Sequence, residues 1–224
     1  MENPNRRSTL ALAVLSLLGE AEQYGEGAMH PYRMQQLIKA RGKDQVVNVG
    51  QRASLYRTID RLCKAGLIAV HEVSREGARP ERTAYSLTPQ GRATWREWML
   101  DALATPTKEY PAFPAAIAFI PMLPPQEVLR QLERRHDVLR TELARIDAEL
   151  SADGVPRLFM LEMELLRATT GAELAWVASV IEDLRAGVIA WSEDQLRALA
   201  TATATQADGR DPAEQHGTLS PAGE

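Results

Sequence analysis

The side chains best suited to chemistry in this sequence are basic ones between positions 51 and 82. Arginine presents a planar fork of donors that matches phosphate oxygens and the edge of a guanine, whereas lysine supplies a point charge. Such groups bind a polyanion and read the edges of its bases. The basic residues of this stretch are Arg52, Arg57, Arg61, Lys64, Arg75, Arg79 and Arg82.

Charge is unevenly distributed along the 224 residues, whose formal net charge is −4. Residues 1–98 carry 15 Lys and Arg against 10 Asp and Glu, and residues 99–224 carry 11 against 20. The first part is therefore net positive by 5 and the second net negative by 9. Such a split indicates that only the first half meets a polyanion. The pI near 5.7 argues against indiscriminate coating of nucleic acid.

The elements expected in the first half have the order of a winged helix-turn-helix. Helical spacing of apolar residues, with Pro or Gly at the ends, predicts helices over residues 9–19, 31–42 and 51–65. Residues 67–74 and 82–88 are rich in β-branched and aromatic side chains, so we expect a two-stranded hairpin with a long basic tip.

A fourth helix is expected after this hairpin, because Thr88 is a suitable N-cap and Pro89 suits the first helical position. We therefore expect residues 1–104 to form a winged helix-turn-helix DNA-binding domain. Residues 105–114 contain three prolines and are expected to form a linker.

The third predicted helix separates an apolar face from a basic one. At about 100° per residue, Leu55, Ile59 and Leu62 share the face expected to be buried. Asp60 lies on the opposite, basic face and is expected to pair with Lys64 or Arg57. Arginines on an exposed helix are often only solvated, but the hairpin that follows carries three more. The candidate DNA-binding residues are Gln51, Arg52, Ser54, Tyr56, Arg57, Arg61, Lys64, Arg75, Arg79 and Arg82.

The first turn of a recognition helix enters the major groove, so Gln51 and Arg52 are expected to read base edges. Arg57, Lys64 and the hairpin arginines are suited to phosphates, which position the protein without specifying a sequence.

The second half of the chain is expected to form a helical dimerisation and effector domain over residues 115–198, followed by a disordered tail at 199–224. Its apolar residues recur at alternating spacings of three and four, as in a coiled coil. Two such helices leave wide apolar faces, for which a second copy is the natural cover. The candidate dimerisation residues are Leu129, Leu132, His136, Leu139, Leu143, Ile146, Leu174, Val177, Ile181 and Leu184.

Some of these residues leave two interpretations open. His136 either is a partly exposed or hydrogen-bonded residue of the bundle, or lines a polar spot that senses an inducer or a proton. Several aromatic residues either belong to the core or wall an effector pocket between the domains. These are Trp95, Trp98, Phe113, Phe119 and Trp176.

Catalytic and metal-binding patterns are missing from the sequence. The four histidines are scattered, and no Cys and His residues have metal-ligand spacing. Nucleophile-elbow, P-loop and dinucleotide patterns are absent, so we expect neither an enzyme nor a cofactor. The single cysteine, Cys63, fits a reducing compartment and a cytoplasmic protein, either as a redox thiol or as a small packed side chain. No apolar run approaches the roughly 20 residues that span a bilayer.

Four motifs follow one another with the order and spacing of a known family: "LAVLSLL", "MHPYRMQQLI", "ASLYRTIDRLCKAGLI" and "RTAYSLTPQGR". On these residues the sequence resembles the PadR family of bacterial transcriptional regulators, over roughly residues 9–190. The resemblance implies a homodimer that binds a palindromic operator, usually as a repressor, and that a small molecule such as a phenolic acid or a drug releases. Ser54 and Tyr56 match the family's recognition-helix Ser and Tyr. The loop "EAEQYGEGA" before His30 is longer than usual in the family.

The expected function is therefore sequence-specific, ligand-responsive regulation of transcription, with DNA, a second copy and a small molecule as partners. Two alternatives remain: a winged-helix protein-interaction adaptor, and a ligand carrier without operator specificity. Salt dependence separates them, because phosphate contacts make affinity fall steeply with salt.

Overall fold

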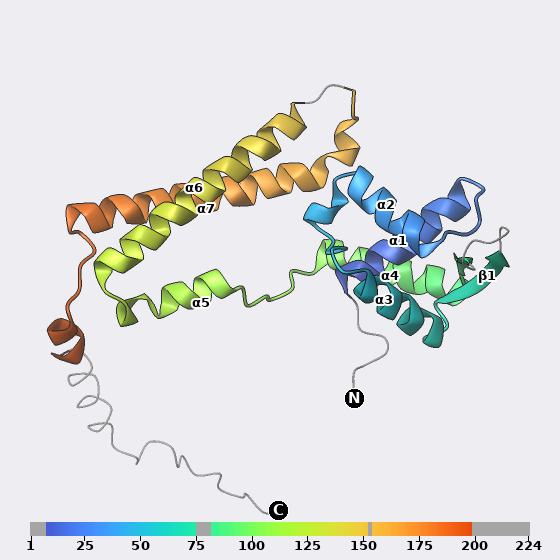
Figure 1. Cartoon of the computed structure of the whole chain (residues 1–224), viewed down its shortest axis with the longest axis horizontal. Helices are drawn as coiled ribbons and strands as arrows, with labels where there is room; N and C mark the ends of the chain where they lie inside the picture. The colour runs from blue at the N-terminus through green and yellow to red at the C-terminus, as the bar shows by residue number, and fades with distance from the viewer. Residues whose placement is uncertain (1–7, 75–81, 152–153, 199–224) are drawn as a thin grey trace, which may run out of the picture. The chain divides into compact units, whose positions relative to one another are not determined.

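The structure is a computed structural model that describes residues 8–74, 82–151 and 154–198 (Figure 1). The chain divides into two compact units, Met1–Glu109 and Tyr110–Glu224. The expected tip of the hairpin and the expected disordered tail lie outside the described residues. Within those residues, no helix is both long enough and apolar enough to cross a membrane.

The first unit has the predicted order of three helices, a hairpin and a fourth helix, which is a winged helix-turn-helix. One short 3-10 helix, η1, lies between α2 and α3. The elements are α1 (Thr9–Gln23), α2 (Pro31–Ala40), η1 (Lys43–Gln45), α3 (Arg52–Lys64), β1 (Ile68–Ser74), β2 (Arg82–Leu87) and α4 (Pro89–Ala104).

Helix α1 is longer than the expected span of residues 9–19. Its N-cap is Ser8, whose Oγ accepts a hydrogen bond of 3.1 Å from the Ala11 amide, and the helix continues through Gly19. Tertiary contacts extend it, because Ala21 is buried and Glu20 accepts two hydrogen bonds, of 2.6 and 2.7 Å, from Arg41 beyond the end of α2.

The hairpin pairs β1 and β2 antiparallel, with a register shift between Val70 and Glu72. The loop after α1 adds to this sheet at one point. The Met29 amide donates to the Tyr85 carbonyl at 2.9 Å, and the Tyr85 amide donates to the Met29 carbonyl at 3.0 Å. The long loop is therefore tied to the hairpin by a bridge that no local pattern predicts.

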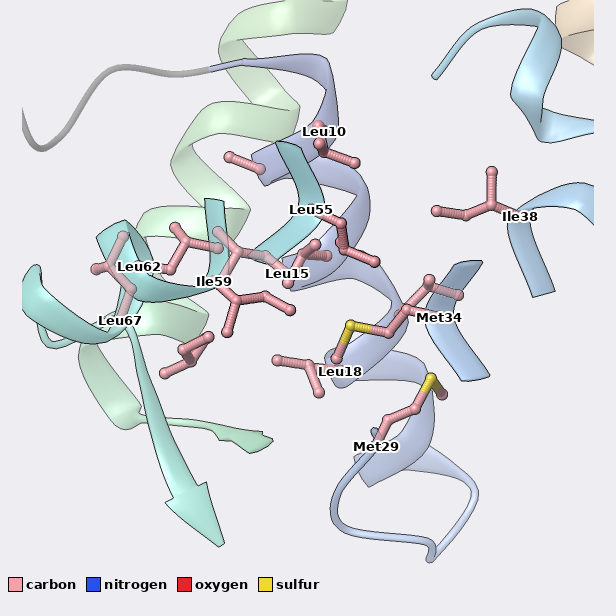
Figure 2. Close-up of a cluster of buried hydrophobic side chains, with 14 of the residues drawn as sticks. Leu10, Leu15, Leu18, Met29, Met34, Ile38, Leu55, Ile59, Leu62 and Leu67 are labelled. Carbon is pink, nitrogen blue, oxygen red and sulfur yellow. The ribbon is translucent and has the colours of Figure 1, made fainter. Parts of the chain in front are cut away.

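The core of the first unit forms where α1, α2 and α3 meet (Figure 2). Leu55, Ile59 and Leu62 are each only 2% exposed, which confirms the predicted buried face of α3. They pack with Leu15 and Leu18 of α1 in one cluster. Burial of such a face fixes the rotation of α3, so its opposite face is directed to solvent.

A close approach of α4 to the chain between α3 and β1 explains the motif "LTPQG". The Thr88 side chain donates to the Gly66 carbonyl at 2.7 Å, and its Oγ1 accepts a hydrogen bond of 2.9 Å from the Gly91 amide. A Cβ at Gly91 would lie 1.8 Å from the Leu67 carbonyl oxygen. Only glycine fits this position, where the start of α4 rests on the chain that links α3 to β1.

The second unit is built around two antiparallel helices, α6 and α7, which lie side by side (Figure 1). Its core cluster consists of Val128 and Leu132 from α6 with Val177 and Ile181 from α7. Residues 193–198 form a further helical turn. The elements are α5 (Ala112–Ala118), η2 (Ile120–Met122), α6 (Pro125–Leu150), η3 (Arg157–Phe159) and α7 (Leu161–Ala186).

Two helix boundaries in this unit follow from local signals. Helix α5 begins at Ala112, inside the stretch expected to be a linker. Pro114 lies in the first turn of this helix, where a missing amide proton costs no helical hydrogen bond. Helix α7 occupies Leu161–Ala186. It starts after a 3-10 turn at Arg157–Phe159 and stops at Gly187, whose φ of +73° is left-handed.

Candidate nucleic-acid interface

The solvent-facing side of α3 carries most of the predicted DNA-binding residues. Gln51 stands at the N-cap, and Ser54 and Arg61 are half-buried beside the exposed residues. The exposed residues of this face are Arg52, Tyr56, Arg57, Asp60 and Lys64.

A fixed turn holds the start of α3 against α2. The buried Gln35 side chain donates a hydrogen bond of 2.9 Å from Nε2 to the carbonyl of Val49, which is itself buried. Asn48 Oδ1 accepts a hydrogen bond of 3.2 Å from the Gly50 amide, which constrains the backbone around Val49. Loss of the hydrogen bond between Gln35 and Val49 would leave a buried donor and a buried acceptor unpaired, which is unfavourable. The bond therefore holds the chain just before α3 against α2.

Local contacts hold the basic side chains loosely. Lys64 pairs with Asp60 at 2.7 Å, which confirms one of the two partners expected for that carboxylate. Arg57 donates to Ser54 Oγ at 3.2 Å, and both side chains remain accessible. Exposed pairs of this kind are worth at most about 1 kcal/mol, so a phosphate can replace them.

The hairpin arginines are only partly described. Arg82 is the first residue of β2, opposite Ser74, and nothing is described of its side chain. Arg75 and Arg79 lie outside the described residues. Their contribution to binding therefore stays a prediction.

Sequence reasoning missed one residue at this surface, Tyr32, the second residue of α2. Tyr32 is 56% exposed, and the Arg52 Cζ atom lies 6.0 Å from the centroid of its ring. An aromatic residue directly after the first-turn proline of the helix before α3 was the available signal.

Cys63 lies half-buried near the end of α3. Burial, followed by the charge of Asp60, raises the pKa of its thiol. Because the thiolate is the reactive form, this favours a packed side chain over a redox sensor. Within the described ranges, no group of three or more His, Cys, Asp and Glu residues is placed to hold a metal ion.

The predicted dimerisation residues contribute to packing within one chain. Leu132, Val177 and Ile181 are buried between α6 and α7, and Ile146 is buried farther along α6. The half-buried members are Leu129, His136, Leu139, Leu143, Leu174 and Leu184. Their role between two copies stays a prediction. His136 Nδ1 lies 3.7 Å from Asp137 Oδ1.

The aromatic residues proposed for an effector pocket lie in different units. Trp95 and Trp98 pack against the core of the first unit, where Trp95 Nε1 donates to Ser16 Oγ at 2.9 Å. In the second unit, Phe119 is exposed, and Trp176 meets Phe113 edge-to-face with centroids 6.0 Å apart. An effector pocket lined by both groups stays a prediction.

A winged helix-turn-helix with a basic, outward-facing third helix is the arrangement that many DNA-binding regulators of transcription use. Residues 14–97 match the model of the transcriptional regulator PadR-like family. Proteins of that family are transcriptional regulators and not enzymes, in line with the expectation from the sequence. No curated protein matches the sequence.

Solved structures with the same fold are about as long as the matched part of this chain. Bacillus subtilis PadR in complex with operator DNA is 18% identical with a TM-score of 0.61, over 79% of this chain and 99% of that one. The same Bacillus subtilis protein with p-coumaric acid is 16% identical with a TM-score of 0.60, over 80% and 99%. The PadR-like regulator BC1756 from Bacillus cereus is 17% identical with a TM-score of 0.51, over 80% and 98%.

Proposed function

We propose that this regulator is a homodimeric repressor whose two winged helices bind a palindromic operator and release it when a small molecule binds. The proposal depends above all on the exposed basic face of α3, which follows the turn fixed by Gln35 and precedes the hairpin. A helix in this position fits the major groove of B-DNA, about 12 Å wide.

Within this face, two roles are proposed. Gln51 and Arg52, at the start of α3, read base edges, because an amide and a guanidinium match adenine and guanine. Arg57 and Lys64 farther along the helix neutralise phosphates. The other proposed DNA contacts are Ser54, Tyr56, Arg61, Arg75, Arg79 and Arg82.

Homodimerisation is supported by the second unit. Helices α6 and α7 leave large apolar side chains in solvent, among them Val138 and Leu165. A twofold dimer would cover such a surface and present two α3 helices to two half-sites. Residues 105–114 would then connect the DNA-binding part to the dimerisation part.

A small-molecule effector is proposed because Bacillus subtilis PadR has been solved with p-coumaric acid. For this chain, the candidate lining residues are Trp95, Trp98, Phe119 and Trp176. p-Coumaric acid is therefore the first compound to add to a complex with DNA. Release of the duplex, accompanied by a change in tryptophan fluorescence, would support an aromatic effector.

The test is a titration of the purified protein against a fluorescent duplex from its own upstream promoter, with a scrambled duplex beside it, at two salt concentrations. Selective binding is expected, with log K falling by about 0.9 per phosphate contact and per unit of log salt. Equal, weak and salt-erased binding to both duplexes would contradict the proposal and favour a protein-interaction adaptor.

Variants separate the two roles. Arg57→Ala and Arg82→Ala should weaken binding to all duplexes alike. Gln51→Ala and Arg52→Ala should instead change preference by about 1–3 kcal/mol at one base position. Equal loss on every sequence for all four variants would refute the division.

A further inference from the structure

We propose that Tyr32 is a specificity-determining positioning residue, whose ring holds the Arg52 guanidinium in the orientation that reads a base. Tyr32 is the second residue of α2 and Arg52 is the first of α3. The Arg52 Cζ atom lies 6.0 Å from the centroid of the ring, within the range of a cation–π contact. The inference rests on the proposed function and assigns a residue to its base-reading step.

Arg52 differs from the other basic residues near this face in how it is held. Arg33 pairs with Glu26, Arg57 is bonded to Ser54, and Lys64 is bonded to Asp60. Among the described residues, Arg52 has no carboxylate or hydroxyl partner, and its contact is the Tyr32 ring. Its forked donors are therefore available to a ligand.

The backbone positions of Tyr32 and Arg52 are held by buried contacts between α2 and the start of α3. Pro31 is buried at the start of α2, and the side-chain amide of Gln35 donates a hydrogen bond from that helix to the Val49 carbonyl just before α3. Both residues line one shallow depression, together with Pro31, Gln35, Leu55 and Tyr56. Since α2 and α3 are fixed to each other here, the ring has a defined position relative to the Arg52 backbone.

Stacking suits the reading of a base because it uses a different part of the guanidinium. A ring that lies over the flat face of a guanidinium leaves the donors uncovered, because they point outward in the plane of the group. Those donors remain free for the O6 and N7 atoms of a guanine. A long side chain loses much rotamer freedom on binding, and ordering it beforehand reduces that loss.

The experiment uses the full chain and measures binding to its promoter duplex and to a set of duplexes with one base pair changed at a time. Tyr32→Leu should weaken operator binding about two- to fivefold, the contribution of an exposed cation–π contact. The loss of discrimination should occur at the base pair at which Arg52→Ala abolishes sequence preference. Tyr32→Phe, which keeps the ring, should bind and discriminate like the natural chain. In an Arg52→Ala background, Tyr32→Leu should cost nothing further.

A matched control is Tyr24→Leu, which removes an exposed tyrosine at the end of α1 and should leave sequence preference unchanged. A loss with Tyr32→Phe equal to that with Tyr32→Leu would overturn the inference and indicate a phosphate contact by the hydroxyl. Additive losses from Tyr32→Leu and Arg52→Ala would also overturn it.

A second readout needs no DNA. In the free protein, the NMR signal of the Arg52 Nε–H should be shifted by the ring in the natural chain and in Tyr32→Phe, and should move in Tyr32→Leu. No movement would refute the stack even if the protein binds DNA selectively. Loss of selectivity in the natural chain itself would instead refute the proposed function.

Discussion

The two units of the chain differ in how far each covers its own apolar side chains. Among the described residues, the core cluster of the first unit contains sixteen buried side chains drawn from α1, α2, α3, β1 and three loops. The core cluster of the second unit contains four, from α6 and α7 alone. Large apolar side chains stay in solvent along that unit, including Val138, Leu158, Leu165 and Val188.

Because of this difference, we expect the two units to be stabilised in different ways. A core closed by several elements is stabilised within one chain, so damage to it should appear as unfolding at any protein concentration. A pair of helices with uncovered apolar residues gains stability from association, which depends on concentration. Substitutions placed in each unit can therefore break or sharpen the comparison.

The largest effect is expected for Gly91→Ala in the first unit. A Cβ would lie 1.8 Å from the Leu67 carbonyl oxygen and 2.8 Å from its carbonyl carbon, so backbone has to move. We expect a loss of about 4 kcal/mol or more in the free energy of unfolding, measured by urea denaturation. A loss below about 1 kcal/mol would show that α4 and Leu67 separate easily.

Gly171→Ala in α7 is the matched control. A Cβ there meets nothing within 4 Å, and alanine favours a helix over glycine by about 1 kcal/mol. The same chemical change should therefore stabilise the second unit slightly. If Gly171→Ala destabilised the protein instead, we would infer that another chain packs against this glycine.

The next effect concerns association. Leu165→Asp puts a charge on a residue of α7 that is 65% exposed and should leave each chain folded. Because a twofold interface repeats the change, we expect the dimer to weaken by about 100-fold or more. Light scattering after gel filtration should then find a monomer at micromolar concentration.

Leu103→Asp is the control for this prediction, since Leu103 is exposed on α4 of the first unit. It should leave the dimer intact. A dimer that survives Leu165→Asp and dissociates with Leu103→Asp would reverse the roles given to the two units.

The comparison also explains which features the sequence predicted. The ends of α3 and α4 depend on local signals such as Thr88 and Gly66, and the buried face of α3 depends on spacing alone. The extension of α1 depends on Arg41, far along the chain, and was missed. The Met29–Tyr85 bridge was missed for the same reason.

In the second unit, the start of α5 depends on an ambiguous residue type. Prolines around Pro114 predicted a linker, but a proline in the first turn of a helix costs no hydrogen bond. Phe113 then packs below Arg135, whose Cζ lies 3.5 Å from the ring centroid. At the candidate DNA surface, spacing identified Arg52 on α3 but not Tyr32, because their proximity depends on how α2 meets α3.

A moderate effect is expected for Gln35→Leu in the first unit. The change keeps the size of the side chain but leaves the buried Val49 carbonyl without its donor, which should cost about 1–3 kcal/mol of stability. It should also loosen the start of α3 and reduce discrimination between duplexes. Gln36→Leu, on the exposed side of the same helix, should do neither. Equal melting temperatures for the two variants would show that the turn does not depend on Gln35.

The smallest effect compares one ion pair from each unit through its pH dependence. The hydrogen bond from Arg41 lowers the pKa of Glu20 below its usual value near 4.5, and that from Arg145 lowers the pKa of Glu142. A lowered pKa in the folded state contributes stability above the unfolded pKa, and this is lost as pH falls through the folded pKa. At pH 7, Glu20→Gln should therefore cost about 0.5 kcal/mol, and the gap should close below pH 4.5.

The two pairs differ in what they join. Glu20 and Arg41 connect α1 to the chain after α2, whereas Glu142 and Arg145 lie three residues apart on α6. A local pair also forms in a partly folded helix, so Glu142→Gln should cost less than Glu20→Gln at every pH. Urea unfolding of both variants at pH 7, 5 and 3 measures this order. If Glu142→Gln reduced the free energy of unfolding more than Glu20→Gln, the ion pair on α6 would be strengthened by contact with a second chain. That outcome would sharpen the contrast between the units.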